Sequence, residues 1–273
     1  DSCYGEKHDT IQPRYKVTLP EAHIGDIEID TKLLDSYGCL PENIRQFYLD
    51  ARAVLSSNPD AGFSHPDIID AARKNELPLM GSPMLGNLRP GGVDIWLRPA
   101  KMEKLVVKVT TAGGGTEKLF VADDVEPGVA QRIVMDGLTA NKNYNYSVIV
   151  NNQKIAEGKF KTAPVSDNKG VFKLAFGSCF HKIGLHNPNL INQILNRKPH
   201  AMMLLGDMAV DDRENQINMH RSDYLLRDVS KAWSELAAHV PLYASWDDHD
   251  YFNNDLGGIS EGFTEADREA VRA

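Results

Sequence analysis

The sequence is poor in cysteine, has no long apolar run and has no excess of basic residues. Its three cysteines, Cys3, Cys39 and Cys179, cannot all pair with one another, which excludes a disulfide scaffold. No apolar run approaches the roughly 18 residues that a transmembrane helix needs, so no membrane span is predicted. The 30 basic and 38 acidic residues give a net charge of −8, and this charge argues against a general nucleic-acid-binding surface. A substrate that carries phosphate is still allowed, because a bound metal can reverse the sign of a site.

The N-terminus has neither an initiator methionine nor a hydrophobic signal region, which indicates that the chain has been trimmed. Cys3 could pair with Cys39, be the remnant of a lipid-modified cysteine, or be an ordinary thiol in a terminal segment. The 42% of apolar residues is enough for a sizeable core. The length of 273 residues suggests two domains or one large domain.

Residues 1–80 are expected to form a helical N-terminal extension. No regular pattern stands out over residues 1–30. Pro41 suits the first position of a helix, and apolar residues recur at helical spacing from Ile44 to Leu55. A second helix is predicted over 66–77, capped by Ser64 or His65. We expect this extension to have a packing role.

Residues 81–164 have the pattern of an antiparallel β-sandwich. Segments of alternating apolar and polar residues, such as 93–98, 104–111 and 144–150, are separated by glycine, proline and asparagine turns. The segment Gly137–Tyr146 resembles the loop and strand of fibronectin type III-like domains, in which an aromatic residue on the penultimate strand anchors the loop. A polar linker over 162–170 marks the predicted domain boundary.

Residues 171–273 show a β-α-β-α-β order that predicts parallel strands at 172–177, 201–205 and 241–246, with helices at 188–195 and 224–238. The continuous apolar run at 201–205 predicts a strand buried on both faces, with Met202 and Met203 in the core. A capping box at Thr264 predicts the start of a last helix. Because three parallel strands alone would expose an edge, we expect the chain to be truncated at its C-terminus.

Each of the three predicted parallel strands is followed by side chains that can bind a metal. Cys179 follows the first, Asp207 the second, and the run Asp247–Asp250 the third. The carboxyl ends of parallel strands meet at one crevice, so these groups would form a site for one or two metal ions. Each signal alone has a structural alternative: a buried thiol, a turn aspartate or a solvated loop. His181 could face the same crevice, whereas His186, His200, His220 and His239 are predicted to be surface or capping residues.

Together these motifs carry a resemblance to a known family. The segments Gly177–Cys179, Leu205–Asp212 and Trp246–Asp250, followed by Asn253 and Asn254, resemble the alkaline phosphatase D family of the metallophosphoesterase (calcineurin-like) superfamily. The likeness extends over about residues 84–273. It implies an α/β metallophosphoesterase-like domain, of which the N-terminal part is present at 171–273, preceded by the β-sandwich.

The resemblance also implies roles for individual residues. Cys179, Asp207 and Asp248 would be metal ligands, and His249 would approach the phosphoryl group and stabilise or protonate the leaving oxygen. It implies a supporting role for Asn253 and Asn254. Further candidates for supporting roles, around the metals or the substrate, are His181, Asp211, Asp212 and Asp250.

Two departures from the family pattern affect the expected metals. Val210 stands where the family has a metal-binding tyrosine, so the iron-plus-calcium pair of the family is not assured, and iron, calcium or zinc ions remain the expected cofactors. Asp211 or Asp212 could compensate. The further histidine and aspartate ligands of the family have no counterpart in these 273 residues.

The predicted function is metal-dependent hydrolysis of a phosphate ester, either a monoester or a diester, by a metal-activated water. Phospholipid head groups are one possible substrate. The alternative is a non-catalytic surface protein that binds a partner through its β-sandwich and retains an inactive phosphatase remnant. The resemblance and the trimmed N-terminus predict an exported protein, periplasmic or on the cell surface.

Overall fold

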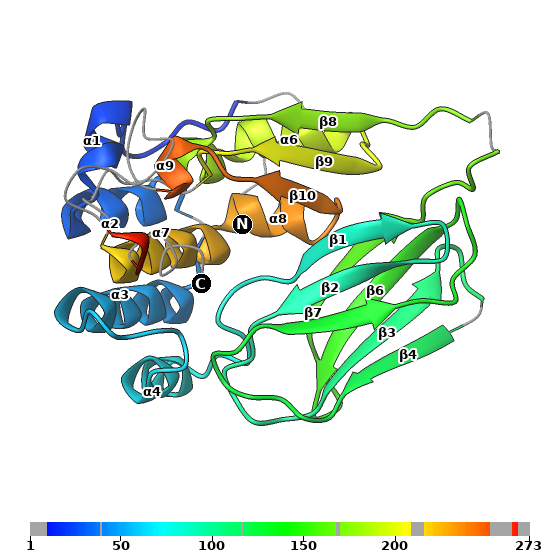
Figure 1. Ribbon diagram of the computed structural model, residues 1–273, viewed down its shortest axis with the longest axis horizontal. Coiled ribbons are helices and arrows are strands. Elements are labelled where there is room, and N and C mark those ends of the chain that lie inside the picture. Colours follow the sequence, from blue (N-terminus) through cyan, green and yellow to red (C-terminus); the bar gives the residue numbers. More distant parts are fainter. Residues whose placement is uncertain are drawn as a thin grey trace.

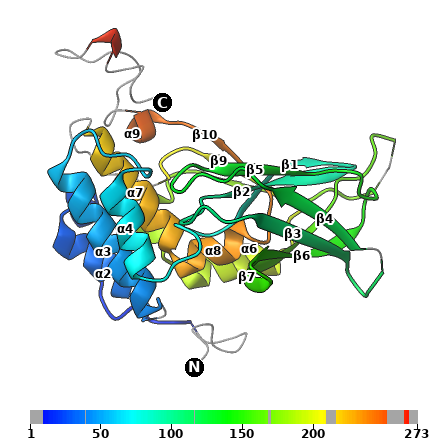
Figure 2. The same cartoon turned by 90° about the horizontal axis from the view of Figure 1, so that it is seen from below.

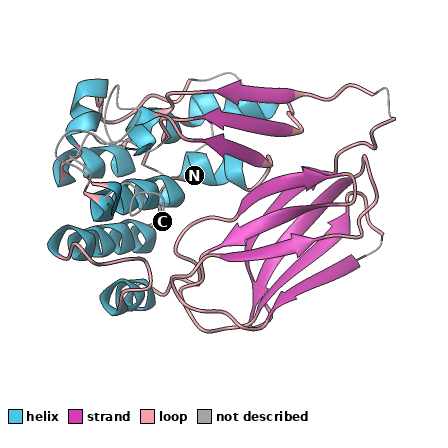
Figure 3. Cartoon of the chain, viewed as in Figure 1, coloured by secondary structure: helices cyan, strands magenta, loops and turns pink. Residues whose placement is uncertain are grey.

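The computed structural model describes residues 10–38, 40–115, 117–167, 170–208, 216–251 and 264–266. Within these segments the chain forms nine helices and ten strands. The strands form two sheets, and most of the helices gather on one side of them (Figures 1 and 3). None of the helices in these segments combines the length and the apolar character that crossing a bilayer requires.

The two helices predicted in the N-terminal extension are present, and two unpredicted helices precede them. Pro41 is the N-cap of the first predicted helix rather than its first residue. His65 caps the second, since its Nδ1 accepts a hydrogen bond from the Asp67 amide at 3.3 Å. The four helices are α1 (Leu19–Ile24), α2 (Ile27–Asp35), α3 (Glu42–Ser57) and α4 (Pro66–Lys74).

The C-terminal part of the described chain holds five helices. The prediction of one helix over 224–238 was wrong, because the chain breaks at Ser230. Ser230 has an extended backbone, and its hydroxyl accepts a hydrogen bond from the Trp233 amide at 3.4 Å, which caps a new helix. Only three residues of the predicted last helix, 264–266, are described. The five helices are α5 (His181–Leu185), α6 (Pro188–Asn196), α7 (Ile217–Val229), α8 (Lys231–Ala237) and α9 (Asp248–Tyr251).

The strands are arranged in a four-stranded sheet, in the order β4-β3-β6-β7, and a six-stranded sheet, in the order β5-β2-β1-β10-β9-β8. The three strands predicted to be parallel, β8, β9 and β10, are parallel neighbours. The ten strands are β1 (Met84–Arg89), β2 (Gly92–Leu97), β3 (Leu105–Thr111), β4 (Glu117–Ala122), β5 (Gln131–Met135), β6 (Asn143–Val150), β7 (Gln153–Lys161), β8 (Leu174–Gly177), β9 (Ala201–Leu205) and β10 (Leu242–Ser245).

The six-stranded sheet joins strands from both sides of the linker. Its β1 pairs in parallel with β10, with Gly86 opposite Leu242. The edge of β10, expected to be open, is therefore covered by β1. The parallel strands that precede the candidate site therefore share one sheet with β1, β2 and β5, which were expected to belong to the sandwich. The candidate site lies at the end of strands in this six-stranded sheet.

The loop before β6 is anchored as its sequence predicts. The Tyr144 hydroxyl accepts a hydrogen bond from the backbone amide of Thr139 at 2.9 Å. Tyr144 also stacks on Phe160 of β7, with 5.5 Å between the ring centroids. The likeness of this region to fibronectin type III domains stays a prediction.

In the described segments, three apolar cores hold the elements together. One is formed by residues of α2, α3, α4 and α7, which lie together in Figure 2, with α3 packed against both α4 and α7. A second fills the space between the two sheets of the sandwich. The third lies between β9 and the helices α6 and α8. The N-terminal extension therefore packs directly on the C-terminal region, because Leu225, Leu226 and Val229 of α7 belong to the first core.

One face of the parallel strands is exposed, contrary to the prediction that 201–205 is buried on both faces. Met202 is 1% exposed and lies in the core, but Met203 is 39% exposed, so its assignment to the core was wrong. Side chains alternate between the two faces of a strand, and the helices that the structure describes cover the face of Met202 and Leu204. The other face presents Phe176 and Tyr243 beside Met203.

Candidate metal centre

The parallel register of β8, β9 and β10 brings three loops to one edge of the sheet. Gly177 lies opposite Leu204, and Ser245 lies opposite Leu205. The carboxyl ends of the three strands therefore lie side by side at this edge. Cys179, Asp207 and the segment 247–250 follow these strand ends within a few residues.

Backbone contacts lock the first two loops together. The Cys179 amide donates to the Gly206 carbonyl at 3.2 Å, and the His181 amide donates to the Asp207 carbonyl at 2.9 Å. Cys179, His181 and Asp207 have φ angles of 55°, 48° and 54°. Such left-handed conformations cost residues other than glycine about 1–3 kcal/mol each and often occur at functional sites.

Gly206 allows the third loop to approach. Its φ is 91°, and a Cβ added there would lie 2.3 Å from the Asp247 Cβ. Any larger residue would push the segment 247–250 away from Asp207. The glycine of the Gly206-Asp207 motif is therefore required by packing.

The carboxylate of Asp250 ties the third loop to the second. It accepts hydrogen bonds from the amides of Asp207 at 2.6 Å, Met208 at 3.1 Å and Asp247 at 3.2 Å. The Tyr224 hydroxyl of α7 donates to it at 3.2 Å. Burial, followed by the charge of Asp250, raises the pKa of Tyr224, so this hydroxyl keeps its proton. Asp250 thus acts as a support for the loop around Asp207.

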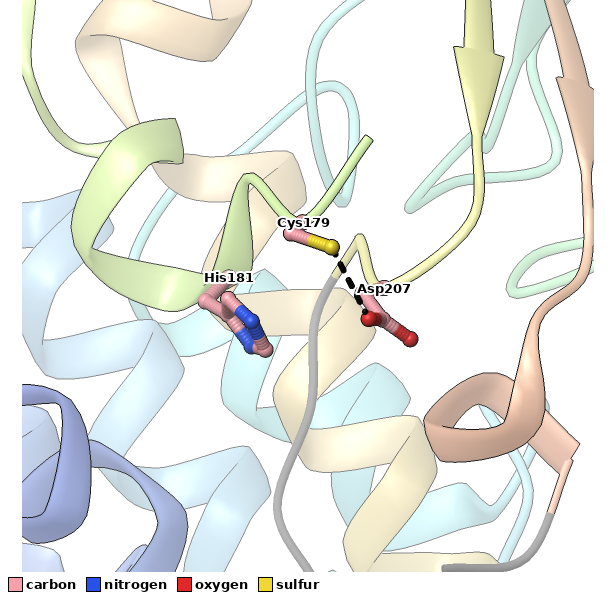
Figure 4. Close-up of side chains that lie close together, drawn as sticks. All are labelled: Cys179, His181 and Asp207. Carbon is pink, nitrogen blue, oxygen red and sulfur yellow. Dashed lines mark hydrogen bonds between the residues drawn. The ribbon is translucent and has the colours of Figure 1, made fainter. Parts of the chain in front are cut away.

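Cys179 and Asp207 are in direct contact. The Cys179 thiol donates to Asp207 Oδ2 with 3.3 Å between the two atoms, as Figure 4 shows. A hydrogen bond with Ser178 lowers the pKa of Cys179, but the bond to Asp207, partial burial and the charges of Asp207 and Asp247 together raise it. The neutral thiol is therefore favoured as long as no cation offsets the carboxylates.

Asp207 belongs to two groups of potential metal ligands. Cys179, His181 and Asp207 offer ligand atoms that all lie within 4.8 Å of one another, and so do Asp207, Asp248 and His249. Asp207 is 5% exposed, and its Oδ1 is buried with no hydrogen-bond partner among the described residues. A buried carboxylate oxygen without a partner is costly, and a cation bound at Oδ1 would remove that cost. The residues present therefore fit a metal ion.

A third histidine, His23 of α1, joins this cluster, although sequence reasoning gave it no role. Its Nε2 lies 3.4 Å from Nδ1 of His181. Its ring centroid lies 5.0 Å from that of His181 and 5.3 Å from that of His249. The sequence does contain a signal for α1, since Thr18 is followed three residues later by Glu21, as in a capping box.

A buried ionic network lies beneath the cluster. Lys182, next to His181, places its Nζ 3.0 Å from Asp30 Oδ1 and 2.8 Å from Asp223 Oδ1. Arg52 pairs with the other oxygen of Asp30 at 2.8 Å. These four side chains come from α2, α3, α5 and α7, and each is less than 10% exposed. The network connects the N-terminal helices to α5, which begins at His181, just after the loop that carries Cys179.

Several residues with predicted roles lie outside the described part of the chain. This holds for Val210 and for the possible ligands and supporting residues Asp211, Asp212, Asn253 and Asn254. It also holds for Cys3 and Cys39. The structure brings together the other candidates: Cys179, His181, Asp207, Asp248, His249 and Asp250.

No protein-family model matches the sequence, and no curated protein is significantly similar to it. Among solved structures, the chain is similar to that described as "Structure of PhoD", with a TM-score of 0.57 and 19% identity over 71% of this chain and 43% of that one. A purple acid phosphatase, PPD1 from yellow lupin (Lupinus luteus) seeds, matches with a TM-score of 0.47 and 14% identity over 68% of this chain and 38% of that one. The first likeness shows that the fold is PhoD-like. The chain spans less than half the length of either structure.

Proposed function

We propose that this chain carries a metal centre for the hydrolysis of phosphate esters. The observation that carries the proposal is the position of Asp207. Its carboxylate is shared by two groups of potential ligands, and its Oδ1 is buried without a hydrogen-bond partner among the described residues. A carboxylate in this position suits a bridge between two cations. The PhoD-like fold supports the proposal.

The donor atoms favour particular metals. A thiol sulfur, imidazole nitrogens and carboxylate oxygens are combined within one small site. Sulfur and nitrogen ligands suit iron or zinc better than calcium, which prefers oxygen ligands alone. We therefore propose iron or zinc near Cys179 and His181.

Each residue of the site would then have its own role in hydrolysis. Cys179, His181, Asp207 and Asp248 would hold cations, which when bound supply charge neutralisation for the phosphate and activation of a water. His249 is 6% exposed and lies beside Asp207 and Asp248. We assign it the donation of a hydrogen bond, or of a proton, to the oxygen that leaves phosphorus. Asp250 would keep the Asp207 loop in place during the reaction.

The test is hydrolysis of nitrophenyl phosphate mono- and diesters by the full-length protein loaded with zinc or iron. We expect His249→Ala to lower turnover by about 10²–10⁴-fold, the usual contribution of a general acid, and to retain the cation near Cys179 and His181. Asp207→Asn should lose both metal and turnover. Asp123→Asn, which changes an exposed carboxylate paired with Lys104, is the matched control and should change neither.

The same experiment decides between hydrolysis and the non-catalytic alternative. A full-length protein that binds no metal and cleaves neither ester would favour a binding module. Full activity in Asp207→Asn would show that the assigned site is not the active site. Export to the periplasm or the cell surface is part of the proposal and follows from the family resemblance.

A further inference from the structure

His23 reaches the candidate metal centre from a part of the chain with no predicted chemistry. It lies on α1, in the N-terminal extension, whereas the other members of the cluster follow β8, β9 and β10. The three imidazole rings of His23, His181 and His249 form a triangle with centroid distances of 5.0, 5.3 and 6.0 Å. The side chain of His23 is half-buried.

The position of His23 is fixed by contacts at both ends of α1. At the start of the helix, the amide and the hydroxyl of Thr18 donate to Glu21 Oε2 at 2.8 and 2.7 Å. At its end, Gly25 has a φ of 63° and forms the C-cap. The Gly25 carbonyl accepts a hydrogen bond from Arg52 at 2.9 Å. A six-residue helix is marginal alone, so these contacts place the last turn, which carries His23.

The contact between His23 and His181 joins specific ring nitrogens. His23 Nε2 lies 3.4 Å from His181 Nδ1, so one nitrogen donates and the other accepts. A neutral imidazole has one N–H and one lone pair. If His181 donates from Nδ1, its lone pair is on Nε2. If His23 donates instead, the lone pair of His181 faces His23 and Nε2 carries a proton that would repel a cation.

We infer that His23 is a positioning residue that accepts the Nδ1 proton of His181 and so leaves the Nε2 lone pair of His181 for the cation. The inference rests on the proposed function, since the Nε2 lone pair of His181 acts as a ligand only where a cation binds. Histidines that bind metals commonly donate their second ring N–H to a fixed acceptor, and loss of that acceptor typically costs about 10–100-fold in metal affinity. In this chain the acceptor is an imidazole supplied by the N-terminal helices.

The first test observes the tautomer of His181 directly, without metal. Long-range ¹H–¹⁵N correlation spectra are recorded at about pH 8, where an ordinary imidazole is neutral. We expect the Nδ1–H form of His181 in the parent protein, a mixture of forms in His23→Ala, and recovery of the Nδ1–H form in His23→Gln. The glutamine side-chain oxygen can accept the same proton, so a recovery separates positioning from mere packing.

The second test measures the affinity of the same proteins for zinc by calorimetry. His23→Ala should bind zinc about 10–100-fold more weakly, His23→Gln should recover part of the loss, and His239→Ala should bind like the parent. His239 lies beyond the end of α8, where its Nδ1 contacts the Glu235 carbonyl. Thermal unfolding of each variant shows whether the fold is retained.

The outcomes separate this inference from the proposed function. A parent protein that binds no zinc would contradict the proposed function, and the role of His23 with it. If His23→Ala binds zinc as tightly as the parent does, the inferred role of His23 is overturned and the proposed function is not. An Nε2–H form of His181 in the metal-free parent, or equal loss of affinity in the alanine and glutamine variants, would also overturn it.

Discussion

Cys179 Sγ and Asp207 Oδ2 are 3.3 Å apart, although 28 residues separate them in the sequence. The contact arises because parallel strands β8 and β9 end together. It puts a thiol and a buried carboxylate at the two sides of one potential cation site. A metal that replaced the thiol proton would remove the donor of this hydrogen bond and bind both atoms.

This relationship predicts a spectroscopic signature. Cobalt(II) added to the protein should give a sulfur-to-metal charge-transfer absorption, because thiolate is a ligand of such borderline metals. Cys179→Ser should abolish this absorption and leave the fold intact, since the side chain is exposed. Absorption spectra during a cobalt titration provide the measurement. A charge-transfer band that survives in Cys179→Ser would place the metal elsewhere.

The second prediction concerns Asp250, whose carboxylate accepts four hydrogen bonds around Asp207. In Asp250→Asn one acceptor oxygen becomes a donor, so at least one amide N–H loses its partner. We expect a loss of about 1–3 kcal/mol in the free energy of unfolding and a fall of about 10–100-fold in zinc affinity. Chemical denaturation and calorimetry measure the two effects.

The control for this variant is Asp247→Asn, three residues earlier in the same loop. Asp247 is exposed, and its side chain accepts a hydrogen bond from the Asp248 amide at 3.1 Å. The same loss of charge at Asp247 should cost less than about 1 kcal/mol in stability, as surface changes usually do. Equal losses in the two variants would mean that net charge, and not the hydrogen bonds of Asp250, holds the loop.

The third prediction concerns the buried network beneath the site. Lys182 is 1% exposed and lies between Asp30 and Asp223, which are both fully buried. Lys182→Met keeps the approximate volume but leaves both carboxylates without this cation. We expect a loss of about 3–5 kcal/mol in the free energy of unfolding, the usual cost of removing one partner of a buried ion pair.

An exposed lysine provides the comparison. Lys231 pairs with Glu235 at 2.9 Å, with side chains 46% and 31% exposed. Lys231→Met should change the free energy of unfolding by less than about 1 kcal/mol, because exposed pairs contribute little. If the two methionine variants unfold at the same denaturant concentration, the network does not hold the N-terminal helices to α5.

The sequence predicted the parts of the fold whose signal is local. The parallel strands follow from short apolar runs, and the meeting of Cys179, Asp207 and the Asp247–Asp250 segment follows from the rule that such strands end together. The exposure of Met203 could not be predicted, because an apolar run has the same pattern whether one face or both are covered.

The position of His23 beside His181 could not be predicted for a different reason. The helix that carries His23 has six residues. Its C-cap, Gly25, is held by a hydrogen bond from Arg52, which lies 27 positions later in the sequence. The break at Ser230 likewise depends on a side-chain cap within a sequence that suits one continuous helix. Hydrophobic periodicity in the sequence does not indicate long-range hydrogen bonds or side-chain caps of this kind.

The last prediction concerns the pH dependence of stability. His186 was expected to be a surface or capping residue; it is the C-cap of α5 but is buried, and its Nε2 has no hydrogen-bond partner among the described residues. Burial lowers the pKa of His186 to about 4, with a further decrease from Lys182 and an opposing effect of Asp30. The unfolded chain has the ordinary histidine pKa of about 6.5, so between these two values the unfolded state binds more protons than the folded state.

The sign of the effect follows from this difference in proton binding. Well above a pH of about 6.5 the imidazole is neutral in both states and its titration contributes nothing. As the pH falls from about 6.5 to about 4, the free energy of unfolding should decrease by about 1.4 kcal/mol per pH unit, about 3 kcal/mol in total. His186→Leu and His186→Asn both remove the titrating group, and their different polarity separates packing from protonation. The free energy of unfolding is measured by urea denaturation at a series of pH values. Plotted against pH, it should change less steeply in both variants than in the parent, whatever their stability at neutral pH. A dependence on pH as steep as that of the parent would show that His186 is not buried as a neutral imidazole.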